Sequence, residues 1–260
     1  MGMSPNPLLL AVAAAALGLA GCQTTGPARD VSGESVVPGA QAPGKDQVYV
    51  ELAAAYLMEG QIGVALAKAQ QAVEVNPSSS NGHNVLGLVY ERMGEAGKAE
   101  TEYQESLRLS PDNYYAHNAY GAFLCKQRRT AESEKEFQAA ITNPLNQSPW
   151  IAMTNAAICA QDQGDRASAE RQFRDALQRN PRFAPALLRM ARVTVDAGDY
   201  QSARQYLERY AAVAPASAES LYLLVRVERQ IGSRNKAAAY ERMLRERFPD
   251  SAEIQRLRTQ

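Results

Sequence analysis

Residues 80–111 read SNGHNVLGLVYERMGEAGKAETEYQESLRLSP, and this stretch decides the fold. Apolar residues recur at helical spacing on both sides of Gly94, which predicts two helices joined by a short turn and closed by Pro111. The arrangement recurs along the chain. The closing prolines are Pro77, Pro111, Pro144, Pro181, Pro215 and Pro249, separated by 34, 33, 37, 34 and 34 residues. A period of about 20 to 50 residues predicts an array of stacked repeats rather than a single globular core.

Each unit also carries small residues at fixed positions. With the closing proline as position 32, position 8 is Ala53, Gly87, Gly121, Ala157, Ala191 and Val225, and position 20 is Ala65, Ala99, Ser133, Ala169, Ala203 and Ala237. Small side chains at these positions let the two helices of a unit approach closely. Position 15 is glycine in five units and Arg128 in the third. Glycine there favours a left-handed helix C-cap, which a residue bearing Cβ adopts only with strain.

These positions together resemble the tetratricopeptide repeat. The resemblance implies an all-α fold, a right-handed superhelical solenoid of six helix-turn-helix repeats within residues 46–260. One unit has too little partner surface to bury its apolar face alone, so we expect stability to come from stacking of neighbouring units. The polar segment 251–260 has apolar residues at Ile254 and Leu257, which predicts a capping helix at the end of the array.

The amino terminus resembles an export signal. Residues 8–20 form an apolar run of thirteen, which is long enough for a signal-peptide core and short for a membrane span. The run ends in LAGC at Leu19–Cys22, which resembles the lipobox of bacterial lipoproteins. The resemblance implies that residues 1–21 are a signal peptide and that Cys22 carries covalent lipid.

The residues after the cysteine indicate a destination and a linker. Lipoproteins retained at the inner membrane tend to have Asp after the cysteine, whereas this chain has Gln23, so the resemblance implies the periplasmic face of the outer membrane. Residues 22–45 are rich in glycine and proline without a helical period, which predicts a flexible tether.

Composition argues against several functions. The 28 basic and 28 acidic residues leave no net charge, so we expect no nucleic-acid partner. The two histidines, His83 and His117, both occupy position 4, which favours helix packing over a metal pair. The sequence has no metalloprotease HExxH and no phosphate-binding glycine loop. We therefore expect no enzymatic activity, no metal and no cofactor other than the lipid on Cys22.

The third junction departs from the period. Pro144 lies one residue early, and two residues are inserted near 146–148 before the fourth unit begins at Trp150, which predicts a local change in superhelical twist. Cys125 and Cys159 lie on the first helices at either side of this junction. In an oxidising compartment they are a candidate disulfide that contributes roughly 3 to 4 kcal/mol, with two buried free thiols as the alternative.

First-helix positions 2, 5, 9, 12 and 13 are not used for packing, so we expect them to form a concave binding surface. In the first three units the candidate groove residues are Val50, Ala54, Leu57, Met58, Asn81, Asn84, Arg92, Tyr115, Asn118 and Lys126. Amide and mixed-charge side chains suit the backbone of an extended peptide. The apolar set in the first unit predicts a partner surface, or else packing of Leu57 and Met58 against the tether. In the sixth unit, Tyr222, Arg226 and Arg229 predict a smaller basic and aromatic patch.

The whole chain resembles the type IV pilus biogenesis lipoproteins of the PilF/PilW type. The resemblance rests on the lipobox, the tether, six repeats, and the segments NAYGAFLC at Asn118–Cys125 and SLYLLVRVER at Ser220–Arg229. It implies a pilotin that binds the secretin subunit of the type IV pilus, and other pilus assembly proteins as further partners, without catalysis. A periplasmic scaffold for another cell-envelope assembly is the alternative. An enzyme with a catalytic cluster around Asp162, Asp196 or Arg226 is the least favoured interpretation.

Overall fold

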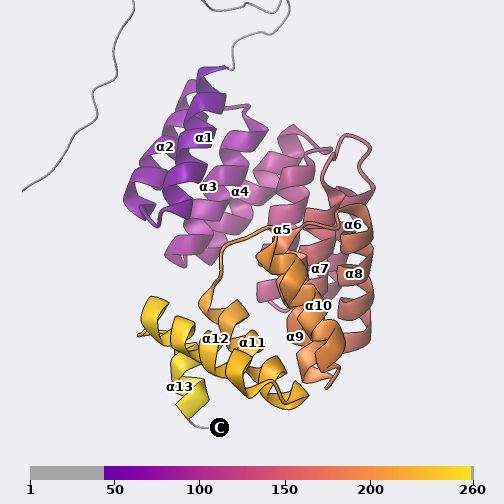
Figure 1. The fold of residues 1–260 in the computed structure, drawn as a ribbon. Coiled ribbons are helices and arrows are strands. Elements are labelled where there is room, and N and C mark those ends of the chain that lie inside the picture. Colours follow the sequence, from indigo (N-terminus) through magenta and orange to yellow (C-terminus); the bar gives the residue numbers. More distant parts are fainter. Residues whose placement is uncertain (1–43, 259–260) are drawn as a thin grey trace, which may run out of the picture. The chain divides into compact units, whose positions relative to one another are not determined.

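The computed structural model describes residues 44–258, which fold into thirteen α-helices without a strand (Figure 1). This confirms the predicted all-α repeat solenoid. The helices are α1 (Lys45–Met58), α2 (Ile62–Val75), α3 (Ser80–Met93), α4 (Ala96–Leu109), α5 (Tyr114–Lys126), α6 (Thr130–Thr142), α7 (Pro149–Asp162), α8 (Arg166–Arg179), α9 (Ala184–Asp196), α10 (Tyr200–Ala211), α11 (Ala218–Ile231), α12 (Arg234–Arg247) and α13 (Ala252–Arg258). The predicted signal peptide, Cys22 and all but the last residues of the predicted tether lie outside the described residues. In the described part, each helix is too short or too polar to cross a membrane.

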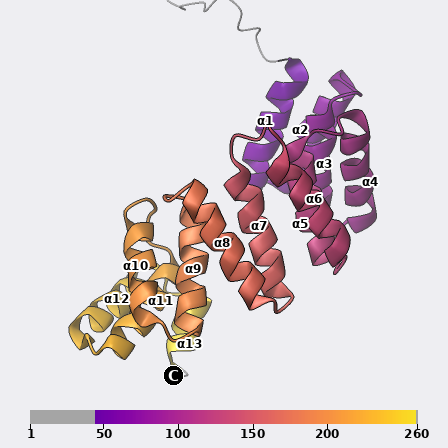
Figure 2. The same ribbon diagram turned by 90° about the vertical axis from the view of Figure 1, so that its right-hand side faces the viewer.

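Consecutive helices pair within each unit, and the pairs follow one another along the array (Figure 2). The first helix of each unit packs against its own second helix, as α1 does with α2 and α3 with α4. Along the first half of the array, the first helices α1, α3, α5 and α7 also pack against one another in that order. This second set of contacts places residues one repeat apart side by side, and it creates the surface on which a partner can lie.

The small residues at position 8 make room for aromatic rings from the second helix. A Cβ atom added at Gly87 would lie 2.8 Å from Cε1 of Tyr103, and one added at Gly121 would lie 2.9 Å from Cδ1 of Phe137. Tyr103 and Phe137 are themselves buried. Glycine is therefore required here by close approach, which is the reason that the sequence pattern predicts.

The carboxyl end of the described array is closed by α13. Ile254 and Leu257 are buried there in one cluster with Leu223 of α11 and Leu244 of α12. The helix thus covers the apolar face that the last full unit would otherwise expose to water.

The third junction contains the two inserted residues in the loop between α6 and α7. This loop, 143–148, has six residues, as does the loop 212–217 between α10 and α11, and α5 and α7 remain in contact across it. The insertion therefore lies outside the helical stack.

Candidate functional site

An open cavity with a volume of about 610 Å³ runs along α3, α5 and α7. Six of the ten predicted groove residues line it: Leu57, Asn84, Arg92, Tyr115, Asn118 and Lys126. Val50, Ala54, Met58 and Asn81 lie outside this lining. We refer to this cavity as the main groove.

The apolar floor of the main groove is already packed. Leu57 lines the cavity but is only 8% exposed, because Val85, Leu86 and Val89 of α3 pack in the same cluster. The next repeat therefore covers most of the Leu57 side chain. Met58 is 85% exposed and is not among the residues that line the cavity.

The middle of the main groove carries three asparagines. The Nδ2 of Asn155 donates to Oδ1 of Asn118 at 2.9 Å. Asn84 is 8% exposed, and its Oδ1 atom is buried without a hydrogen-bond partner among the described residues. A buried amide oxygen without a donor costs about 1 to 3 kcal/mol.

Asn81 has a structural role instead. Its Oδ1 accepts from Nδ2 of Asn113 at 3.0 Å, and Asn113 in turn caps α5 by accepting from the backbone N–H groups of Tyr115 and Ala116. The side chain therefore links two repeats, and it is not among the residues that line the main groove.

Charged groups of the main groove at the carboxyl ends of α3 and α5 are partly paired. Glu91 accepts from Nζ of Lys126 at 2.6 Å and from the hydroxyl of Tyr103 at 2.8 Å. Burial raises the pKa of Tyr103 far above its ordinary value, and the Glu91 carboxylate raises it further. Lys126 is thus held by an ion pair, whereas Arg92 is exposed and makes no ion pair within residues 44–258. Arg92 is the lining cation that can meet an acidic partner group.

The sequence interpretation missed several lining residues. Leu88 and Ala122 occupy position 9 of their units, which belongs to the expected concave set, so their spacing was sufficient to find them. Phe123 and Ala119 lie at packing positions, and Asn155 lies across the irregular junction. Their place in the groove follows only from how the units stack.

A second cavity of about 230 Å³ continues from the main groove toward the amino ends of α5 and α7. It shares Tyr115 and Asn118 with the main groove. Its other lining residues are Tyr114, Asn146, Gln147, Ser148, Ile151 and Ala152. The inserted loop contributes one wall, and we refer to this cavity as the loop pocket.

The predicted patch of the sixth unit is not a free basic surface. Tyr222 is buried, and the guanidinium of Arg226 lies 5.9 Å from its ring centroid. Arg226 also approaches Asp196 at 3.4 Å, and Arg229 pairs with Glu241 at 2.7 Å. Carboxylates from neighbouring helices accompany both arginines, so the positive charge of the predicted patch is largely balanced.

The two histidines tie the first helix of a unit to the second. Nδ1 of His83 lies 2.6 Å from Glu102, and Nδ1 of His117 lies 2.6 Å from Glu136. The hydrogen bond to Glu136 raises the pKa of His117. Residues 44–258 contain no cluster of three or more side chains suited to a metal ion. The contacts of both histidines agree with the packing interpretation.

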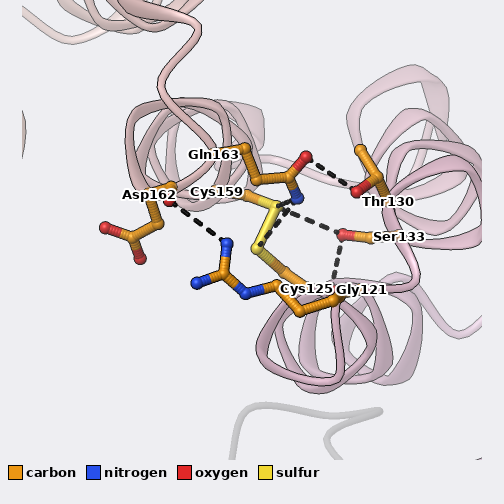
Figure 3. Close-up of a disulfide and its surroundings, with 8 residues drawn as sticks. Gly121, Cys125, Thr130, Ser133, Cys159, Asp162 and Gln163 are labelled. Carbon is orange, nitrogen blue, oxygen red and sulfur yellow. Dashed lines mark hydrogen bonds between the residues drawn. A yellow bond between two sulfur atoms is a disulfide. The ribbon is translucent and has the colours of Figure 1, made fainter.

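Cys125 and Cys159 form a disulfide between α5 and α7, with S–S 2.06 Å and Cα–Cα 5.9 Å (Figure 3). Figure 3 also shows Gln163 beside the sulfur atoms, where its Oε1 accepts from the hydroxyl of Thr130 at 2.7 Å. The bond joins the third and fourth units across the irregular junction, so it holds together two helices that line the main groove.

Stacked antiparallel helix pairs with a groove along their first helices define a helical-repeat scaffold, a class that binds polypeptide segments non-covalently. Family models described as tetratricopeptide repeat match residues 50–114, 85–147, 160–212 and 194–260. The chain belongs to the tetratricopeptide repeat family.

Two solved structures confirm the resemblance to PilF and PilW. PilF of Pseudomonas aeruginosa is 28% identical, with a TM-score of 0.69, and the match covers 82% of this chain and 96% of that chain. PilW, described as a widely conserved type IV pilus biogenesis factor, is 29% identical, with a TM-score of 0.69 and coverage of 83% and 99%. A tetratricopeptide repeat protein from Parabacteroides merdae, at 17% identity and a TM-score of 0.59 over 82% of each chain, shares the fold. No curated protein matches the sequence.

Proposed function

We propose that this protein is a type IV pilus biogenesis factor that acts as a pilotin by binding the secretin subunit. The observation that carries the proposal is the match to PilF and PilW over nearly the whole length of both structures. The action needs no covalent step, because a scaffold that holds and delivers a polypeptide works by binding alone.

The main groove is the proposed site for a secretin segment. Asn84, Asn118 and Asn155 offer amides to the backbone of an extended chain, and the partly exposed Leu88 and Ala122 offer an apolar surface for its side chains. Arg92 offers a charge to an acidic residue of the segment. This mixture favours an extended polypeptide over a small metabolite or a nucleic acid.

The proposed anchor is the covalent lipid on Cys22, which lies outside the described residues. Each buried CH₂ of an acyl chain contributes about 0.8 kcal/mol, so several chains hold a protein at the membrane almost permanently. Anchoring at the periplasmic face of the outer membrane raises the local concentration of the bound subunit where it inserts. A periplasmic scaffold for another cell-envelope assembly is the second candidate, since the groove chemistry suits other extended segments.

The test compares two groove variants with one matched control. Arg92→Glu reverses the exposed lining charge, and Ala122→Trp fills the main groove with a bulky ring. Arg242→Glu places the same charge change on α12, away from the groove. The full-length chain is purified from detergent-solubilised outer membranes, and co-purified secretin and the yield of secretin multimers are measured.

We expect both groove variants to reduce co-purified secretin by about tenfold, because central contacts of an interface commonly contribute more than 1 kcal/mol each. The control should retain it. If secretin is not recovered with the wild-type protein and another envelope assembly component is, the scaffold alternative replaces the pilotin proposal.

A further inference from the structure

The loop between α6 and α7 is held to α6 and to the loop between α4 and α5 by hydrogen bonds of two of its asparagines. Nδ2 of Asn143 donates to the backbone carbonyl of Asp112 at 2.7 Å, and Nδ2 of Asn146 donates to the carbonyl of Ala140 at 2.8 Å. The Oδ1 atom of each asparagine also accepts a backbone N–H two residues further on. The two inserted residues thus belong to a loop tied to the third repeat at both asparagines.

The loop pocket behind this loop has an uncharged, partly aromatic lining. Tyr115 is 58% exposed and Ile151 is 42% exposed, and both face the same cavity of about 230 Å³. The remaining described lining residues carry amides, hydroxyls or a methyl group, without a charged side chain among them. The volume suits one large side chain, and the desolvation of a charged group there would lack an opposite charge to offset it.

The loop pocket lies within reach of a segment bound in the main groove, since Tyr115 and Asn118 line both cavities. Along α5, Tyr115 and Lys126 stand about 16 Å apart at the helical rise of 1.5 Å per residue. An extended chain covers that distance in about five residues. A segment that lies along α5 can therefore place one side chain in the loop pocket while its backbone meets the asparagines of the main groove.

We propose that the inserted loop creates a specificity subsite, the loop pocket, which takes one aromatic side chain of the extended protein segment held in the main groove. The ring packs on Tyr115 and Ile151, and the amides of the loop face its polar edge. This inference rests on the proposed function, because it presumes that the main groove binds an extended segment. It goes beyond that function by assigning an aromatic side chain to the part of the segment next to the third junction.

The experiment uses a phage-displayed library of random peptides selected on the immobilised full-length chain in detergent. Ile151→Asp places a carboxylate in the loop pocket at a half-exposed position in the first turn of α7, where a negative charge suits the helix dipole. Leu145→Asp is the matched control, since Leu145 is an exposed apolar residue of the same loop outside the pocket lining. Gln147→Trp is a second variant that fills the pocket without adding a charge.

We expect peptides selected on the wild-type chain and on Leu145→Asp to share an aromatic residue at one register. Replacing that residue by alanine in a synthetic copy of the best peptide should weaken binding to the wild-type chain by about tenfold. On Ile151→Asp the aromatic preference should give way to Lys or Arg, and on Gln147→Trp it should disappear. Unchanged thermal unfolding of each variant ensures that the fold is intact.

The outcomes separate the subsite from the function on which it rests. Selected peptides without an aromatic register, or an aromatic register that survives both Ile151→Asp and Gln147→Trp, overturn the subsite while the groove variants Arg92→Glu and Ala122→Trp still test the main groove. A wild-type chain that captures secretin but enriches no peptide also overturns the subsite. Failure to capture secretin and failure to enrich peptides together defeat the proposed function as well.

Discussion

Arg128 occupies the position at which five other repeats have glycine. Its φ is 62°, and it is the non-glycine residue with positive φ in the described part of the chain. Gly94, at the same position of the second unit, has φ 81°. The fold imposes a left-handed C-cap on every one of these turns, so the third unit adopts it at a conformational cost.

Arg128→Gly should therefore stabilise the protein by about 0.5 to 1 kcal/mol, because relief of the left-handed strain exceeds the added flexibility of the unfolded chain. Urea unfolding monitored by circular dichroism measures the change. Gly94→Ala is the converse variant, and it should destabilise by about 1 kcal/mol, since a Cβ there meets no atom within 4 Å and only the backbone strain remains. A less stable Arg128→Gly would show that the guanidinium outweighs the strain.

His117 makes stability depend on pH. Its pKa is raised first by the hydrogen bond to Glu136, and also by the Pro111 carbonyl and the charges of Glu136 and Asp112, against the opposing effect of burial. The protonated ring is therefore favoured in the folded state. This stabilisation is fully present below the unfolded pKa of about 6.5 and is lost as pH rises through the higher folded pKa.

His117→Gln should accordingly cost more stability in mildly acidic solution than in alkaline solution. Urea midpoints of the variant and the wild type should differ most near about pH 5.5, and the difference should decrease as pH rises through the raised folded pKa of His117. A difference between the urea midpoints that increases with pH would contradict the raised pKa of His117.

Helices α5 and α7 are joined at two places along the main groove. The disulfide between Cys125 and Cys159 spans 34 residues of sequence, and it lies at the end of these helices near Gln127, away from the inserted loop. The hydrogen bond between Asn118 and Asn155 joins the same helices farther along the groove. Both contacts resist separation of the two helices.

Reduction of this disulfide should lower the free energy of unfolding by about 3 to 4 kcal/mol, as expected for closing a loop of this length. The measurement is urea unfolding of the wild type with and without a thiol reductant. The double variant Cys125→Ser with Cys159→Ser is the control, and its midpoint should not respond to the reductant. Equal urea midpoints of the wild type with and without reductant would show that the disulfide does not stabilise the fold.

The proposed function combines a groove with a membrane anchor. Cys22→Ala should move the protein from the outer-membrane fraction to the soluble periplasmic fraction, because the proposed membrane contact is lipid alone. Immunoblots of fractionated cells measure this, and the groove variants serve as controls that should stay at the membrane. A Cys22→Ala protein that still fractionates with the outer membrane would refute the lipid assignment.

The repeat architecture followed from sequence because its causes are local. Small residues at Gly87 and Gly121, helix-ending glycines and closing prolines act within one unit, and each unit repeats the same physical requirement. The repeat spacing alone therefore predicts that α3 pairs with α4 and that α5 pairs with α6. The main groove was predicted to the extent that it follows this spacing, as for Asn84, Asn118 and Tyr115.

Tertiary structure alone decided which of those exposed positions are available to a partner. Leu57 is covered by α3, Asn81 is engaged by Asn113, and Lys126 is paired with Glu91 from the preceding unit. These partners lie about one repeat away along the chain, so their distance depends on how units stack and not on the period. The period by itself determined the helices and their pairing, whereas stacking of neighbouring units determined the shape and the free groups of the binding surface.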